Sequence, residues 1–401
     1  MPRVIKWNVF SLCVCALFSV MVVQNRLECI LSHVAKNRSI ARRLIEPLRA
    51  FALLLQAFNL SGNFITPIFF GRHNIFERSS PLVCRLRCAD VSSLATLGST
   101  TTLATRSLLD FERDGHVTLR QVLPAAHVQK ILPALDDAYE ACLVDVMRHN
   151  LRVNLGEKKL TAIEARAARE GSPLKSILQK HVDRLQDGSV PFLQAFNLWR
   201  KSPAVAALVS SPELAGAASE LLGADRVRLY QDSLFIKRPG DGETLWHSDL
   251  FTSPLDTNKF VTVWLPLQPV PPEDDGGSGL VFATGSHRDL ALHFWHGDPN
   301  RQIDCSDRGY VESTLDSAGL DVGDSTWHHG WTLHCASPND LPSARRALAI
   351  SYFADGARRL RSPRRRPHTE DSESFSDWLS DILPGSAARH PLLPLVWDAS
   401  R

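Results

Sequence analysis

Two residue types that bind metal ions lie one position apart in Trp246-His247-Ser248-Asp249. On a strand, the side chains of residues i and i+2 project to the same face, about 6.5 Å apart along the chain. Two side chains so placed can converge on one ion. A second imidazole would complete a set of two histidines and one carboxylate, which leaves the open positions that ferrous oxygenases require. The pair alone is not specific, because buried His–Asp pairs also occur in ordinary cores.

A second group of histidines supplies three candidates for the missing ligand, His328, His329 and His334. They follow a Gly323-Asp324 turn, and their spacing alone does not choose among them. Arg345 and Arg346 open the next apolar run. A guanidinium suits a dicarboxylate co-substrate that chelates the metal at one end, because the other carboxylate then enters a buried pocket and needs a planar, bidentate partner.

The elements that must position these residues change in character at Gly223. Before it, apolar residues recur at helical spacing, and we expect a helix after Pro124, one or two charged helices over 157–186 and one helix over 203–222. After it come short β-prone runs separated by Gly, Pro and Asp, at 227–237, 261–270, 279–283 and 347–353. Many short strands with such turns predict a barrel or a jelly roll.

Several motifs recur together from about Leu108 to the tail. They are Phe111 to Val117, Lys237-Arg238-Pro239-Gly240, Trp246 to Asp249, Val263-Trp264-Leu265-Pro266-Leu267, Gly285-Ser286-His287-Arg288, and His334 to Arg345. With these motifs the chain resembles the phytanoyl-CoA dioxygenase family. The resemblance implies an α+β fold, mostly β with surrounding helices, around a double-stranded β-helix (a cupin-like jelly roll).

The resemblance also implies roles for single residues. His247, Asp249 and His334 look like the Fe(II) ligands at the catalytic centre, and Arg345 looks like the partner of the 2-oxoglutarate C5 carboxylate. The family pattern places the distal histidine eleven residues before the arginine, which selects His334 with Arg345. Trp264 resembles a residue that lines the co-substrate pocket, and a core aromatic is the equal alternative.

Other residues near these motifs receive supporting roles. By the same resemblance, His328 and His329 become neighbours of the site or core residues, and Gly285-Ser286-His287 is expected to form a structural turn. Ser248 stands where many members have Gln, so a hydrogen bond to the co-substrate is absent or replaced. Because Asp249 is present, we do not expect the halogenating variant of such sites, in which a halide replaces the carboxylate.

The implied activity is that of an Fe(II)- and 2-oxoglutarate-dependent dioxygenase. It hydroxylates a small organic or lipid-like substrate with O₂ and releases succinate and CO₂, with ascorbate as a candidate reductant. One alternative is a zinc hydrolase on the same three ligands, although Arg345 has no obvious task there. The other alternative is a catalytically silent jelly roll that binds a lipid or protein partner through its extensions.

The composition is that of a globular protein, with 401 residues, 44% of them hydrophobic and 22% charged. A formal net charge of +2 gives no global field that favours nucleic acid as a partner. Five of the eight cysteines precede residue 100, and their spacing forms neither a disulfide framework nor a zinc pattern. We expect a reduced, non-secreted fold.

Three segments are predicted. Residues 1–106 combine an apolar run, Val9 to Val23, with a basic, acid-poor stretch and a linker, which favours organelle or membrane targeting over a plain cytosolic location. An amphipathic helix that packs on the domain or on a membrane surface is the alternative. Residues 107–356 are the predicted oxygenase domain, and residues 357–401 are a tail, first basic and then acidic, expected to be a solvated surface.

Overall fold

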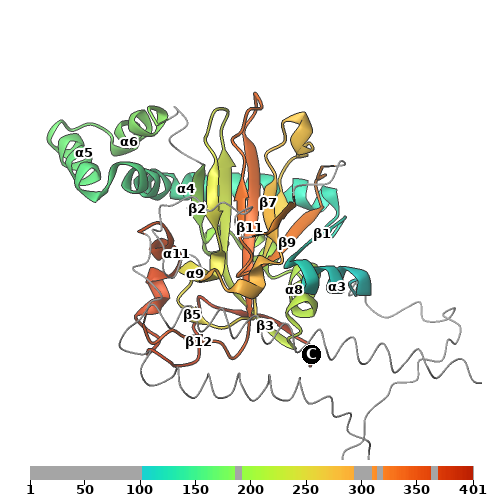
Figure 1. Ribbon diagram of the computed structural model, residues 1–401. Coiled ribbons are helices and arrows are strands. Elements are labelled where there is room, and N and C mark those ends of the chain that lie inside the picture. Colours follow the sequence, from blue (N-terminus) through green and yellow to red (C-terminus); the bar gives the residue numbers. More distant parts are fainter. Residues whose placement is uncertain (1–101, 186–191, 293–308, 314–318, 363–368, 401) are drawn as a thin grey trace, which may run out of the picture. The chain divides into compact units, whose positions relative to one another are not determined.

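Figure 1 shows the computed structural model of the protein, which describes residues 102–185, 192–292, 309–313, 319–362 and 369–400. Residues 93–401 form one compact unit. The predicted targeting or membrane-contact segment, residues 1–106, lies outside the described residues except for its last five. In the part of the chain that is described, no helix has the length and apolar character needed to cross a membrane.

A seven-stranded antiparallel sheet forms the centre of this unit (Figure 1). Its strands in spatial order are β1 (His116–Leu119), β9 (Ser325–His329), β6 (Phe260–Pro266), β11 (Arg345–Ala354), β3 (Arg226–Lys237) and β13 (Leu395–Asp398), with β2 (Leu193–Phe196) also paired to β3. The strands predicted over 227–237 and 347–353 are β3 and β11. The strand predicted over 261–270 ends earlier, at Pro266.

Both faces of this sheet are buried, and residue alternation decides which side chain goes where. On β6, Val261, Val263 and Leu265 pack in the core beneath the helices, while the intervening Trp264 joins a second core with Ala349 of β11. The second core also contains Phe282 and Ala336 and thus lies between the two sheets of the fold.

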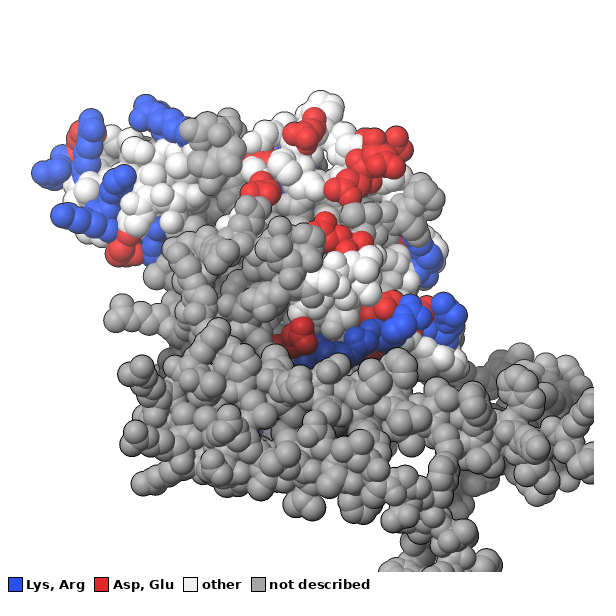
Figure 2. Space-filling view, in the orientation of Figure 1, with Lys and Arg blue, Asp and Glu red and all other residues white. Residues whose placement is uncertain are grey.

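Helices cover the outer face of the large sheet. They are α3 (Thr105–Asp114), α4 (Ala125–Leu155), η1 (Leu198–Arg200), α7 (Pro203–Val209) and α8 (Pro212–Leu222). Two further helices, α5 (Glu157–Arg169) and α6 (Leu174–Asp183), pack against the end of α4 away from the sheet (Figure 1). Val128 and Leu135 of α4 and Leu214 of α8 contribute to the core beneath them. On the face in Figure 2, Lys and Arg side chains gather over the outer end of the molecule, where α5 and α6 lie.

The single helix predicted over 203–222 is wrong, because the chain forms two helices there. Ser211 caps the second helix by accepting a hydrogen bond from the Leu214 backbone N–H at 3.4 Å. Pro212 follows at the first helical position, where a residue without an N–H fits the start of a helix and interrupts a continuing one. Gly223 ends α8 in the left-handed region, with φ +52°, as its place in the sequence predicted.

A four-stranded antiparallel sheet faces the inner side of the large one. Its order is β4 (Thr244–His247), β10 (His334–Ala336), β7 (Leu280–Thr284) and β8 (Val311–Ser313). Phe282 of β7 joins the two sheets, since its ring stacks on His116 of β1 with 4.5 Å between centroids. The remaining short elements are α9 (Asp249–Thr252), β5 (Leu255–Asp256), η2 (Glu273–Asp275), η3 (Ser286–Asp289) and β12 (Arg358–Arg359).

The segment predicted as a tail after residue 356 contributes to the fold. Helix α11 (Thr369–Leu379) places Trp378 in a core with Tyr230 and Phe353. Strand β13 pairs with β3, and Trp397 of β13 lies 3.3 Å from the position of a Cβ on Gly216. The expectation of a solvated surface is therefore wrong for these described parts, because hydrophobic residues beyond the arginine run are buried.

Candidate metal centre

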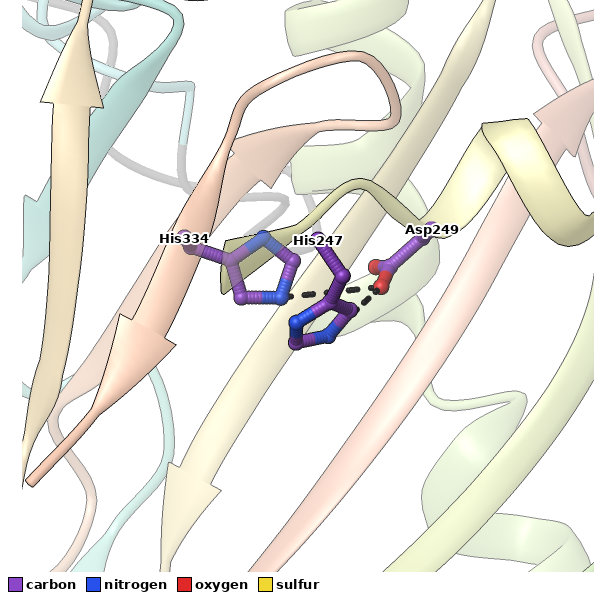
Figure 3. A group of neighbouring side chains, drawn as sticks. All are labelled: His247, Asp249 and His334. Atoms are coloured by element: carbon purple, nitrogen blue, oxygen red, sulfur yellow. Dashed lines mark ion pairs between the residues drawn. The ribbon is translucent and has the colours of Figure 1, made fainter. Parts of the chain in front are cut away.

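Three side chains from the small sheet and the turn that follows it converge at one point (Figure 3). His247 ends β4, Asp249 begins α9 and His334 begins β10. His247 and His334 are direct partners in the antiparallel pairing of β4 with β10. One ligand atom from each of the three residues lies within 4.8 Å of the others. The structure thus brings together the three residues predicted from the sequence.

The local geometry of the His–Asp pair differs from the prediction in one respect. The strand ends at His247, so Asp249 is the first residue of a short helix and not a strand residue. Ser248 between them keeps an extended backbone, with φ −133° and ψ +134°. The relation expected of residues i and i+2 on a strand therefore survives across the end of the strand.

In His247 and in His334, the two ring nitrogens have different partners. Nδ1 of His247 lies 2.8 Å from the Leu245 carbonyl oxygen, and Nδ1 of His334 lies 3.1 Å from the Thr332 carbonyl oxygen. Because a carbonyl only accepts, each Nδ1 carries the proton and each Nε2 keeps its lone pair. The Nε2 atoms face Asp249 Oδ1, at 3.9 Å for His247 and 3.6 Å for His334.

Burial and charge set the protonation of this group. Burial and the neighbouring rings of His247 and His328 hold the pKa of His334 well below its ordinary value. Burial raises the pKa of Asp249, but His334, the hydrogen bond from His328 and the charge of His247 outweigh it and leave the pKa well below the ordinary range. Neutral imidazoles beside an ionised carboxylate are the forms that bind a metal ion.

The donor set fits a divalent transition metal. Two imidazole nitrogens and one carboxylate oxygen match the facial arrangement found with non-haem Fe(II), and the same donors also suit Zn²⁺. His334 is buried, whereas the side chain of His247 is 43% exposed. The candidate centre is therefore open on the His247 side.

Arg345 is a buried cation for which the described residues supply no carboxylate partner. The residue is 5% exposed, and its Nη1 donates to the Ser278 carbonyl oxygen at 2.5 Å. Its buried Nε has no hydrogen-bond partner among the residues that the structure describes. Burial lowers the pKa of this guanidinium to about 10. An unsatisfied, buried guanidinium is the feature that the carboxylate of a dicarboxylic co-substrate would complete.

Two further residues accompany Arg345. Trp264 of β6 is 3% exposed, and its ring lies 5.2 Å from the guanidinium carbon of Arg345. Lys237 is opposite Arg345 in the pairing of β3 with β11 and is fully buried. Burial and the charge of Arg345 lower the pKa of Lys237 to about 7. Two buried basic side chains thus lie side by side at this end of β3 and β11, and the charge of Arg345 disfavours the charged form of Lys237.

The other histidines considered from the sequence lie outside the triad. Nδ1 of His329 accepts from the Trp331 backbone N–H at 3.1 Å, and Nε2 of His287 lies 3.2 Å from the Glu112 carbonyl oxygen. Ser286 accepts a hydrogen bond from the Leu333 backbone N–H at 2.9 Å, directly before His334. The Gly285-Ser286-His287 segment is thus a turn that supports the strand of His334.

Two contacts of the candidate site were not foreseen in detail. Thr262 of β6 and His328 of β9 both approach the Oδ2 atom of Asp249, at 2.6 and 3.0 Å. His328 was expected only as a neighbour or core residue, and Thr262 was not singled out at all. The partial signal was alternation on β6, which places Thr262 and Trp264 on one face.

Comparisons with known proteins agree with this geometry. Over 159 residues the chain is 25% identical to a probable alpha-ketoglutarate-dependent hypophosphite dioxygenase of Stutzerimonas stutzeri. That match covers 38% of this chain and 54%, about half, of the relative. The chain also resembles the crystal structure of SnoK, a non-heme alpha ketoglutarate dependent carbocyclase from nogalamycin biosynthesis.

The SnoK likeness has a TM-score of 0.52 at 23% identity and covers 74% of this chain and 99% of SnoK. It confirms the predicted α+β jelly-roll fold. The sequence profile of the phytanoyl-CoA dioxygenase (PhyH) family matches residues 111–347, which contain His247, Asp249, His334 and Arg345. This match covers more than half of the sequence, and the chain therefore belongs to the phytanoyl-CoA dioxygenase family.

Proposed function

We propose that this chain is an Fe(II)- and 2-oxoglutarate-dependent oxygenase that oxidises a small organic substrate. One observation carries the proposal: the ligand atoms of His247, Asp249 and His334 lie within 4.8 Å of one another. The same inner sheet faces hold the buried Arg345, which has no carboxylate partner in the described part of the chain. When bound, Fe(II) and 2-oxoglutarate together supply activation of O₂, with succinate and CO₂ as products.

The protein's own residues then bind and orient. His247 and His334 offer Nε2, and Asp249 offers Oδ1, at the open side of the small sheet. Arg345 takes the C5 carboxylate of 2-oxoglutarate with its unsatisfied guanidinium edge, while the Trp264 ring limits where the guanidinium can lie. Fixed positions of this kind lower the entropic part of the barrier.

Apolar residues around the site keep water away. Phe282 is 4% exposed, and its ring lies 6.3 Å from the ring of His334. Trp264, Ala347 and Ala349 share one core with Phe282. Exclusion of water strengthens the charge interactions inside the site and protects a reactive oxidant from side reactions.

The proposal is tested by 2-oxoglutarate turnover in the full-length protein. With Fe(II), ascorbate and C1-labelled 2-oxoglutarate, we expect release of labelled CO₂ and equal formation of succinate. Asp249→Ala should abolish both. Asp256→Ala is the matched control, because Asp256 is an exposed aspartate nearby in the sequence, and it should retain turnover.

Two results would contradict the proposal. Hydrolysis of ester or amide substrates with Zn(II), without 2-oxoglutarate turnover under Fe(II), would favour a zinc hydrolase. Absence of both activities in a protein that does not bind Fe(II) would favour a silent jelly roll.

If 2-oxoglutarate turnover is observed, candidate substrates are ranked by how strongly each stimulates succinate formation.

A further inference from the structure

The two oxygens of the Asp249 carboxylate have different surroundings. Oδ1 faces the two ligand imidazoles, 3.6 Å from His334 Nε2 and 3.9 Å from His247 Nε2. Oδ2 faces the large sheet, 2.6 Å from Thr262 Oγ1 and 3.0 Å from His328 Nε2. One oxygen is therefore directed at the candidate metal position, while the other is already bound by the protein.

Thr262 approaches Oδ2 as a hydrogen-bond donor. An ionised carboxylate only accepts, so the Thr262 hydroxyl proton is directed at Oδ2. Thr262 Oγ1 also lies 3.0 Å from Ser351 Oγ, and this second contact must then have Ser351 as the donor. Thr262 is paired with Ser351 of β11 and with His328 of β9, so the three side chains form one row across the sheet.

His328 is fixed in the same way. Its residue is 2% exposed, and because Oδ2 only accepts, the proton of the ring lies on Nε2. A protonated Nε2 has no lone pair for a metal ion. Nε2 of His328 thus cannot bind the ion while it holds Asp249, although the rings of His328 and His334 have centroids only 4.3 Å apart.

We propose that Thr262 and His328 are positioning residues that hold Oδ2 and make Asp249 a one-oxygen ligand. The inference rests on the proposed function of the site. A carboxylate that bound the ion through both oxygens would take a further coordination position. A facial triad must keep three positions open, two for the chelating co-substrate and one for O₂. The two donors therefore preserve the position that O₂ needs.

Metal affinity tests this inference without reference to turnover. Thr262→Val and His328→Phe each remove one donor to Oδ2, and we expect Co(II) and Fe(II) to bind about 10–100-fold more weakly. Thr262→Ser keeps the hydroxyl, and His328→Gln places an amide N–H near the position of Nε2. Both conservative variants should bind the metals nearly as tightly as the unaltered protein.

A matched control comes from the same sheet. Thr326 is two residues before His328 on β9, and its buried Oγ1 has no hydrogen-bond partner within the described ranges. Thr326→Val removes a hydroxyl of the same kind at the same depth and should leave metal affinity unchanged. Thermal unfolding of each metal-free variant identifies any that fail to fold. If His328→Phe does not fold, Thr262→Val, which changes the side-chain volume little, decides whether the donors to Oδ2 affect metal affinity.

The visible absorption of bound Co(II) reports the coordination of the ion. Its intensity falls as the coordination number rises, so a carboxylate released to bind through both oxygens should lower the intensity in Thr262→Val. Thr262→Ser should restore the unaltered spectrum. A purely structural role of Thr262 would change the melting temperature without changing this spectrum.

The outcomes separate this inference from the proposed function. If the unaltered protein binds Fe(II) and turns over 2-oxoglutarate while Thr262→Val matches it in affinity and spectrum, the positioning role is wrong and the oxygenase proposal stands. If the unaltered protein binds neither Fe(II) nor Co(II), both proposals are wrong. Weaker binding in Thr262→Val and its rescue in Thr262→Ser support the inference.

Discussion

At the scale of single residues, the buried guanidinium of Arg345 lowers the stability of the ligand-free protein, and a bound carboxylate would offset this effect. A buried guanidinium without a carboxylate partner is unfavourable, and the lowering of its pKa to about 10 by burial expresses this. Natural proteins retain such groups where function needs them. The charge is therefore most simply explained by a dicarboxylate that binds against Trp264.

Replacement of Arg345 by Gln tests this explanation. We expect the KM for 2-oxoglutarate to rise by at least ~30-fold, because loss of one partner of a buried, hydrogen-bonded charge pair costs about 2–5 kcal/mol. Fe(II) affinity should change little. Arg346→Gln is the control, since Arg346 pairs with the surface residue Asp136. An unchanged KM in Arg345→Gln would show that 2-oxoglutarate binds elsewhere.

The residue spacing together with the family resemblance predicted the three residues that converge, but not the residues that support them. The His247–Asp249 spacing is local, and the family pattern selected His334, so the sequence contained enough information for the three ligands. Thr262 and His328 meet because β6 pairs with β9 in one register. Long-range register is set by the packing of both sheets and not by any local motif, so these two contacts needed the structure.

At the scale of elements, the C-terminal segment shows where sequence patterns misled. The arginine run from Arg358 to Arg366 has the character of a solvated surface. Beyond it, however, β13 completes the edge of the large sheet by pairing with β3. Such a pairing joins segments that are far apart in the sequence, and composition alone does not reveal it.

The burial of Trp378 in α11 shows that this segment packs in the core of the domain. Its side chain is fully buried and packs edge-on against Tyr230 of β3, with 6.2 Å between ring centroids. Trp378→Ala should lower the free energy of unfolding by about 3–5 kcal/mol, as for other large-to-small changes in a core. Chemical denaturation of the metal-free protein measures this change.

The neighbouring Leu383→Ala provides the comparison, because Leu383 is 73% exposed. We expect it to change the free energy of unfolding by less than about 0.5 kcal/mol. Equal, small effects of both substitutions would mean that the segment is a solvated tail after all.

At the scale of the whole molecule, two facing sheets bury several histidines that ordinary proteins leave in water. Burial lowers the pKa of His116 and of His329 to about 4 in each case. In the unfolded chain these groups have pKa values near the ordinary histidine value of 6.5. Below that value the unfolded state takes up protons that the folded state does not.

The metal-free protein should therefore lose stability as the pH falls from about 6.5 to about 4, by roughly 1–3 kcal/mol for each of the two histidines. Above pH 6.5 both rings are neutral in the folded and in the unfolded chain, so their burial no longer lowers the free energy of unfolding. The lowered pKa of Asp249 affects stability only below the ordinary aspartate value of 3.8, which lies outside this window. Denaturation curves at several pH values, with His116→Leu as the variant, measure the effect.

His116→Leu should show a shallower decline with pH than the unaltered protein. An equal decline with pH in His116→Leu and in the unaltered protein would contradict the burial of the His116 ring in neutral form. Comparing the two proteins separates His116 from Asp232, whose pKa burial raises to about 6 and which acts with the opposite sign in this window.

Anaerobic titration with Fe(II) tests the central claim most directly, when the unaltered protein is compared with His334→Ala and His329→Ala. We predict one tightly bound ion per chain in the unaltered protein and in His329→Ala, and loss of that ion in His334→Ala. Full binding in His334→Ala, or loss of the ion in His329→Ala alone, would contradict the convergence of His334 with His247 and Asp249 on one metal.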